Sequence, residues 1–95
     1  MNVVFKPKAE ETLQNVAEFI DDTNLIGAGE RWAVKFVQYI YKIAELNNLK
    51  FPLCHNEALA EDGYSCLIYK GWVIVFKIEK RNFTVYQIIL GSLLQ

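Results

Sequence analysis

The chain has 95 residues, 53% of them hydrophobic, which suits one domain, residues 1–95, around a single core. Its formal charge is −1, but residues 1–62 carry six Lys or Arg and ten Asp or Glu, a net −4, whereas residues 63–95 carry four and one, a net +3. This mild asymmetry argues against the strong basic stripe of a dedicated nucleic-acid binder. No run approaches the roughly 18 apolar residues of a membrane-spanning helix and the N-terminus lacks a signal-peptide pattern, so we expect a cytoplasmic protein.

The cysteine and histidine content gives no sign of a metal site. Cys54 and Cys66 lie twelve positions apart without a CxxC motif, and His55 is the only histidine. This spacing indicates neither a zinc site nor a disulfide framework. His55 has no neighbouring carboxylate to orient it, which favours a surface residue over a general acid. We therefore expect no metal and no cofactor.

The first predicted elements are a short strand and a helix. Residues 2–6 are rich in β-branched and aromatic side chains, which suits a strand, and Pro7 ends that strand with its fixed φ. Pro7 also fits the first position of a helix that we expect to end near residues 22–24. Glu10 and Glu11 lie where the helix dipole favours acidic groups. The apolar residues of this helix recur at steps of three and four: Ala9, Leu13, Val16, Ala17 and Ile20.

A second, longer helix is predicted after the loop at residues 24–29. Its apolar positions share one face: Trp32, Ala33, Phe36, Val37, Ile40, Ile43 and Ala44. Tyr39 and Tyr41 fall outside this stripe, so we expect them to be exposed. Asn47 and Asn48 offer a stop. Because only about five residues separate the two helices, they should fold back as an antiparallel αα-hairpin.

The C-terminal half is predicted to form strands after a connector. Residues 49–63 lack periodicity and contain Pro52, so we expect a connector with at most one helical turn. Three strand-like runs follow, at residues 64–69, 72–78 and 83–89, and their short separations require antiparallel hairpins. The expected fold is α+β in the order β-α-α-β-β-β, an antiparallel sheet with the αα-hairpin packed on one face.

The central strand is apolar on both of its faces. Its residues alternate between two sets, Trp72, Ile74, Phe76 and Ile78 against Val73, Val75 and Lys77. Two short helices can cover only one side of a sheet, so the other side needs a different cover. We predict that this other side is a docking surface for a separate chain, formed by Leu67, Tyr69, Val73 and Val75. The alternative is a thin second core covered by the protein's own tail.

Several short patterns occur in a fixed order along the chain. They are Ala9-x-x-x-Leu13, then Ala33-x-x-Phe36 running through Leu46, Leu49 and Pro52, then Tyr64 at the start of a strand, then the hairpin of residues 72–78 and 85–89. In this order and spacing the chain resembles, over nearly its whole length, the small toxins of the RelE/ParE superfamily from bacterial type II toxin–antitoxin and plasmid stabilisation systems.

The resemblance implies a cytoplasmic, growth-inhibiting toxin that a cognate antitoxin neutralises, often by covering the sheet. RelE-type members cleave messenger RNA in the ribosome, whereas ParE-type members bind and inhibit DNA gyrase. Many RelE-type relatives have Tyr-Arg where this chain has Tyr64-Ser65, and Ile-His-Gly where it has Ile89-Leu90-Gly91. The missing arginine and histidine would supply a phosphate clamp and a group titrating near neutrality. The resemblance therefore favours a ParE-like toxin that is not an enzyme.

Two alternatives to that function stay open. A RelE-like, ribosome-dependent mRNA endonuclease would have as its candidate catalytic residues Lys70, Lys77, Arg81 and Tyr86. A degenerate member would have lost its toxicity but would still bind its antitoxin. The implied partners are an antitoxin on the predicted docking surface and either gyrase or the ribosome with its message, and a homodimer is also compatible with the resemblance.

Overall fold

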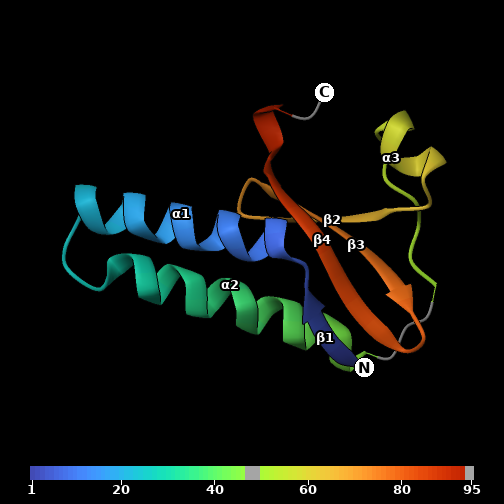
Figure 1. The fold of residues 1–95 in the computed structure, drawn as a ribbon, viewed down its shortest axis with the longest axis horizontal. Coiled ribbons are helices and arrows are strands. Elements are labelled where there is room, and N and C mark those ends of the chain that lie inside the picture. The colour runs from blue at the N-terminus through green and yellow to red at the C-terminus, as the bar shows by residue number, and fades with distance from the viewer. Residues whose placement is uncertain (47–49, 94–95) are drawn as a thin grey trace.

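The computed structural model describes residues 1–46 and 50–93, and it confirms the α+β order β-α-α-β-β-β (Figure 1). Within these residues the elements are β1 (Asn2–Phe5), α1 (Pro7–Thr23), α2 (Ala28–Glu45), α3 (Glu57–Glu61), β2 (Ser65–Tyr69), β3 (Trp72–Glu79), β4 (Asn82–Leu90) and a 3-10 turn (Gly91–Leu93). The helical turn expected in the connector is α3. The stop predicted at Asn47 and Asn48 lies outside the described residues.

The described strands form a sheet in the order β1-β4-β3-β2. β2, β3 and β4 are antiparallel neighbours, as predicted, and each hairpin turns through two residues. Lys70 and Gly71 in the first turn, and Lys80 and Arg81 in the second, all have positive φ. Positive φ at both central positions defines the type I′ turn, whose twist matches that of the flanking strands. β1 lies parallel to β4, so the predicted antiparallel sheet also contains a parallel pair.

The hairpin of α1 and α2 depends on close packing near its turn. Gly29 is buried in α2, and a Cβ at this position would overlap the backbone carbonyl of Ala17 in α1, so the approach requires glycine. The Asp21 carboxylate accepts a hydrogen bond from the Gly29 amide at 2.8 Å, which satisfies an N–H group in the first turn of α2. The hairpin extends well beyond the sheet (Figure 1). In α1 the buried core residues, Ala9 and Leu13, come from the first half of the helix, whereas α2 contributes from Trp32, at the edge of the core, through Phe36 to Ala44.

The main core lies between this hairpin and the sheet. Of the two alternating sets of β3 residues, the one that carries Ile74 and Phe76 meets the helices. Phe76 stacks on Phe83 of β4 with 4.3 Å between ring centroids, and Phe51 of the connector packs edge-on against Phe76 at 5.1 Å. Burying each such ring contributes roughly 1.5–3 kcal/mol. The buried residues of this core are Ala9, Leu13, Phe36, Ile40, Ala44, Ile74, Phe76, Phe83, Val85 and Ile88.

The opposite side of the sheet, called the outer face below, is covered by the connector. Val73 and Val75 are only 7% and 1% exposed. Connector residues 52–56 line a cavity together with Val73, and the Cys54 amide donates a hydrogen bond to the Tyr64 carbonyl at 2.9 Å. Figure 1 shows the sheet between α3 and the α1–α2 hairpin. The prediction of an open apolar face is therefore wrong. The alternative of a thin second core describes this side better, although connector residues, and not the C-terminal tail alone, lie beside Val73.

Candidate functional site

Lys77 and Tyr86, two of the four candidate catalytic residues, meet on the outer face. Tyr86 follows Val85 of the main core, so strand alternation places its side chain on the same side as Lys77, and a β-bulge leaves Tyr86 without a partner in β3. The rings of Tyr86 and Tyr64 pack edge to face with centroids 5.2 Å apart. Lys77 Nζ lies 4.2 Å from the Tyr64 centroid and 5.7 Å from that of Tyr86, and Lys6 Nζ lies 5.5 Å from Tyr86. With Glu79, these residues form what we call the outer-face cluster.

The Tyr86 hydroxyl donates a hydrogen bond to Glu79 Oε1 at 2.7 Å. This bond is the main reason that the pKa of Tyr86 is raised above its ordinary value of 10.0, and partial desolvation and the Glu79 charge act in the same direction. A tyrosine phenol is already protonated at neutral pH, and the raised pKa makes its ionised form, the one that could act as a general base, still harder to reach. The two ammonium groups of the cluster can attract an anion, but its carboxylate is already engaged by Tyr86. The arrangement suits binding better than proton transfer.

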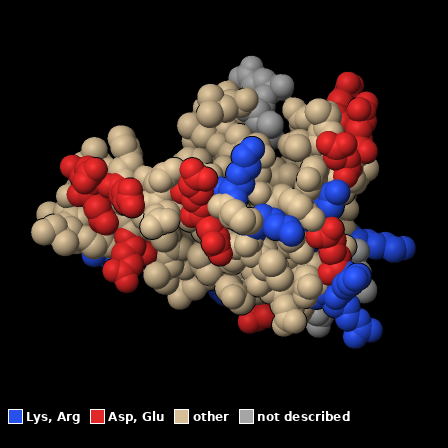
Figure 2. Space-filling model, in the orientation of Figure 1, with Lys and Arg blue, Asp and Glu red and all other residues tan. Residues whose placement is uncertain are grey.

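The other two candidate catalytic residues, Lys70 and Arg81, are not brought to this cluster together. Lys70 lies in the turn before β3, with its Nζ 5.6 Å from the Tyr69 ring centroid, and Arg81 lies in the turn after β3. Since β3 is an eight-residue strand, the two turns are about 25 Å apart. Figure 2 shows basic side chains gathered at the end of the molecule that holds the β3–β4 turn. The four candidates do not form one active site.

The four residues predicted to dock an antitoxin also divide between two faces. In the register of β2 and β3, Leu67 is opposite Ile74 and Tyr69 is opposite Trp72, so both belong to the helix side. The β2 residues that share the outer face with Val73 and Val75 are Ile68 and Cys66, respectively. Directly paired residues point to the same side of a sheet, and a shift of one position reverses the side. The proposed surface of Leu67, Tyr69, Val73 and Val75 therefore does not exist as one patch.

A disulfide between Cys54 and Cys66 joins the connector to β2, with 4.8 Å between their Cα atoms. The expectation that these cysteines form no disulfide is wrong. Their spacing in the sequence carries no recognisable motif, because the bond depends on the connector crossing the edge of β2. Cys66 lies on the outer face opposite Val75, and Cys54 lies in the segment that covers that face. The register of the sheet and the path of the connector, neither of which the sequence provided, together bring the two sulfur atoms within bonding distance.

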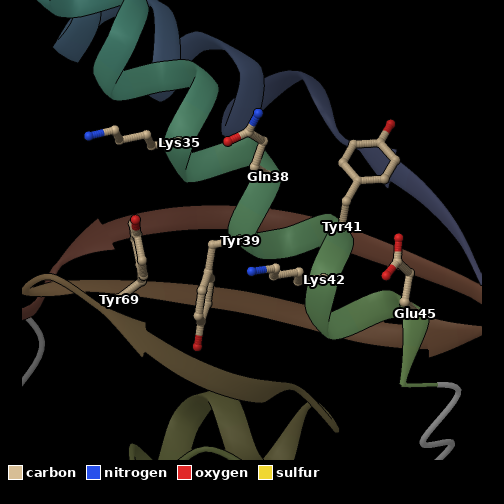
Figure 3. A pocket seen from close by; sticks show the side chains of 7 residues that line it. All are labelled: Lys35, Gln38, Tyr39, Tyr41, Lys42, Glu45 and Tyr69. Carbon is tan, nitrogen blue, oxygen red and sulfur yellow. The ribbon is translucent and has the colours of Figure 1, made fainter.

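An open cleft of about 530 Å³ lies between α2 and the edge of β2 (Figure 3). The Tyr39 and Tyr69 rings stack inside it with centroids 4.3 Å apart. This stacking half-buries Tyr39, which we had expected to be exposed, whereas Tyr41 is exposed as predicted. The cleft is lined by Lys35, Gln38, Tyr39, Tyr41, Lys42, Glu45 and Tyr69. Tyr69 is thus the residue of the predicted docking set that lines this cleft, whereas Leu67 and Val73 line the cavity beside the connector.

The far end of the α1–α2 hairpin exposes large apolar side chains. Leu25 and Ile26, in the turn, are 80% and 96% exposed, and Phe19 in α1 is also exposed. Figure 2 shows acidic side chains gathered over this end of the molecule, and the exposed acids of the last turns of α1 are Glu18, Asp21 and Asp22. We call Phe19, Leu25 and Ile26 the hairpin tip. Apolar side chains exposed at this level and rimmed by charge are typical of a protein-binding surface.

The described residues contain no group of three or more His, Cys, Asp or Glu side chains that could hold a metal ion. In the same residues, no helix is long and apolar enough to cross a membrane. No protein-family model matches this sequence, and no curated protein was found to match it.

Proposed function

We propose that the protein is a toxin of the RelE/ParE type that acts by binding a protein target and is neutralised by a cognate antitoxin. The observation that carries this proposal is the hairpin tip, which extends away from the sheet and exposes Leu25 and Ile26 almost completely. The outer-face cluster adds a second argument against an enzyme, since its Glu79 carboxylate accepts a hydrogen bond from Tyr86 and the pKa of Tyr86 is raised. DNA gyrase is the favoured target through the family resemblance.

The chemistry of the hairpin tip defines the target surface. An apolar pocket would accept Leu25 and Ile26, and basic residues around that pocket would face the acidic rim of Glu18, Asp21 and Asp22. Most of the tip lies in a turn, so its apolar residues can enter a pocket without rearrangement of the core.

The antitoxin contact is proposed at the cleft between α2 and β2. Tyr69 lines this cleft beside Tyr39, and aromatic residues are enriched among those that dominate binding energy at interfaces. Lys35 and Lys42 line the same cleft, so an antitoxin segment that binds there would combine apolar and acidic residues. Val73 and Val75 stay out of this contact while the connector covers them.

An mRNA endonuclease is kept as the second candidate because Lys77 and Tyr86 do come together. Lys77 Nζ lies 5.7 Å from the Tyr86 ring, and Lys6 adds a second ammonium group to the same cluster. Such a group could hold an RNA phosphate. Its weakness is the absence, among these residues, of a carboxylate free to accept the proton of the ribose 2′-OH.

The cytoplasm is the compartment that the proposed toxin requires. Cytosolic thiols are kept reduced, and disulfides in cytosolic proteins of mesophiles are usually transient. The Cys54–Cys66 bond is therefore expected to open and close in the cell rather than to persist as a permanent crosslink.

The test is induced expression in a bacterium, with growth, DNA-damage signalling and messenger RNA integrity measured together. We expect growth arrest with DNA-damage signalling and intact messages. The double variant Leu25→Asp with Ile26→Asp should abolish the arrest, because it places two charges on the hairpin tip while leaving the core unchanged. The matched controls Lys77→Ala and Arg81→Ala should arrest growth like the wild type.

Two outcomes would contradict the proposal. Codon-linked cuts in ribosome-bound messages that disappear with Lys77→Ala would establish the endonuclease instead. A soluble, folded protein with no effect on growth, which still binds a small protein encoded beside it, would establish the degenerate member.

A further inference from the structure

The Cys54–Cys66 disulfide closes a loop that contains α3 and lies over the outer face. Cys66 stands opposite Val75 in the β2–β3 pair, and Cys54 lines the same cavity as Val73. The bond therefore joins the connector segment that lies beside Val73 to β2, the strand paired with β3.

Apart from this bond, the loop has few attachments to the sheet. The Cys54 amide donates to the Tyr64 carbonyl at 2.9 Å, and Leu53 forms an isolated bridge with Ser65. The hydrogen bonds around α3 are local: the Leu59 amide donates to the Asn56 side chain, and the Gly63 amide donates to the Ala60 carbonyl. None of the five residues of α3 is buried. A segment with so little apolar burial opens locally at low cost, so the disulfide is its main constraint.

The disulfide can be reached from solvent. Cys54 and Cys66 both line a cavity of about 480 Å³, and Ile68 at its border is 72% exposed. Cys54 is 6% exposed, whereas Cys66 is half-buried. Thiolate attack on a disulfide requires access to one sulfur atom, so Cys66 Sγ is the accessible point of attack and Cys54 Sγ is the leaving group.

We propose that Cys54–Cys66 is a reversible thiol–disulfide exchange site, reached through this cavity by a dithiol reductant, and that its reduction releases the loop of residues 54–63 from the outer face. The reductant's first thiolate bonds to Cys66 Sγ, and Cys54 Sγ leaves as a thiolate that takes a proton from water. The reductant's second thiol, after losing its proton, attacks its own sulfur in the mixed disulfide and frees the Cys66 thiolate, which is protonated in turn. Two electrons pass to the cysteine pair, and the reductant leaves as a cyclic disulfide.

The consequence of reduction is a change in what the outer face exposes. With the loop released, Val73 loses the connector residues that line its cavity, while the helix side keeps its own core. The oxidised protein covers this part of the outer face and the reduced protein exposes it. The exchange site does not depend on toxin activity.

The experiment compares oxidised and dithiothreitol-reduced full-length protein under native conditions. Alkylation followed by mass spectrometry should find no reactive thiol in the oxidised protein and two in the reduced one, and oxidised glutathione should reverse the change. Hydrogen exchange of the amides at residues 53–66 should accelerate at least tenfold on reduction, while exchange in α1, α2 and β4 stays within twofold. Binding of a dye specific for exposed apolar surface should rise several-fold.

The double variant Cys54→Ser with Cys66→Ser is the matched control. It should behave like the reduced wild type whether or not dithiothreitol is present. Equal hydrogen exchange in the two redox forms would overturn the release of the loop. Thiols that react only after denaturant is added would overturn the access route, and acceleration of exchange in the helices would show a crosslink that supports the whole fold.

Discussion

The two faces of the sheet bury the neighbouring residues Val75 and Phe76 by different means. On the helix side, Phe76 lies beneath two long helices and stacks on Phe83, within a core that draws on α1, α2, β3 and β4. On the outer side, Val75 is paired with Cys66, whose disulfide joins β2 to a connector whose only described helix has five residues. The helix side is thus stabilised by packing, whereas the outer side needs a covalent tie to hold a thin cover.

Truncation of Phe76 and of Val75, neighbours on opposite faces of the sheet, should give the largest difference in the free energy of unfolding. Phe76→Ala removes a fully buried ring from the main core and should lower the free energy of unfolding by about 4 kcal/mol. Val75→Ala removes two methyl groups from the outer side and should cost about 2 kcal/mol. Both values come from denaturant unfolding of the oxidised proteins. Equal losses would show that the outer side is as well packed as the helix side.

Loss of the disulfide should rank next. The bond closes a loop with a sequence separation of 12, so Cys54→Ser with Cys66→Ser should lower the free energy of unfolding by about 2–3 kcal/mol through the larger entropy of the unfolded chain. The near-ultraviolet circular dichroism of the core aromatic residues should be preserved, because they lie mainly on the helix side. A loss larger than that of Phe76→Ala would reverse the ranking of the two faces.

The helix side has its own sensitive point at Gly29. Gly29→Ala places a methyl group against the backbone carbonyl of Ala17, which the two helices can relieve only by moving apart, at a cost of about 1–3 kcal/mol. Thermal unfolding measures this cost. Ala28→Gly, one residue earlier in the same helix, is the control for helix propensity alone and should cost about 0.5–1 kcal/mol. A Gly29→Ala protein as stable as the wild type would mean that the hairpin packs more loosely than described.

The contrast between the faces also explains what the sequence could predict. The periodicity of Leu13 and Phe36 and the turn at Lys70-Gly71 are local signals, and they located the helices and strands with little error. The side on which Leu67 lies depends on the pairing of β2 with β3, which is a long-range property. The disulfide depends further on the path of an irregular connector. The wrong predictions therefore concern mainly the outer face, where no periodic pattern in the sequence indicates which residues are in contact.

Within the candidate site, too, the sequence predicted the strands on which residues lie but not the contacts between their side chains. Lys77 and Tyr86 were rightly placed on neighbouring strands, but the bulge at Tyr86 and its contact with Tyr64 left no mark in the sequence. Glu79 was not considered, although an acidic residue beside a hairpin turn can reach back across the strand pair to a tyrosine. Because the Glu79 carboxylate accepts the hydrogen bond of the Tyr86 hydroxyl, the cluster can attract an anion but has no carboxylate left to act as a base.

The smallest expected effect concerns this contact on the thinly covered side. Glu79→Gln removes the charge that helps to raise the pKa of Tyr86, so that pKa should fall toward 10.0. A group whose pKa is raised in the folded state binds its proton more tightly there than in the unfolded chain. Its contribution to the free energy of unfolding is therefore complete below about pH 10 and is lost as the pH rises through the folded-state pKa of Tyr86.

Glu79→Gln should accordingly leave stability at pH 7 nearly unchanged and should weaken the decline of stability above pH 10. Carbon-13 NMR of the tyrosine ring, followed as a function of pH, measures the Tyr86 titration directly, and Glu79→Asp is the control that retains the charge with a shorter reach. If Tyr86 titrates identically in Glu79→Gln and the wild type, the hydrogen bond to Glu79 does not raise the pKa of Tyr86. The Glu79 carboxylate would then be free to act as a base beside Lys77, and the outer face, rather than the hairpin tip, would be the place to look for activity.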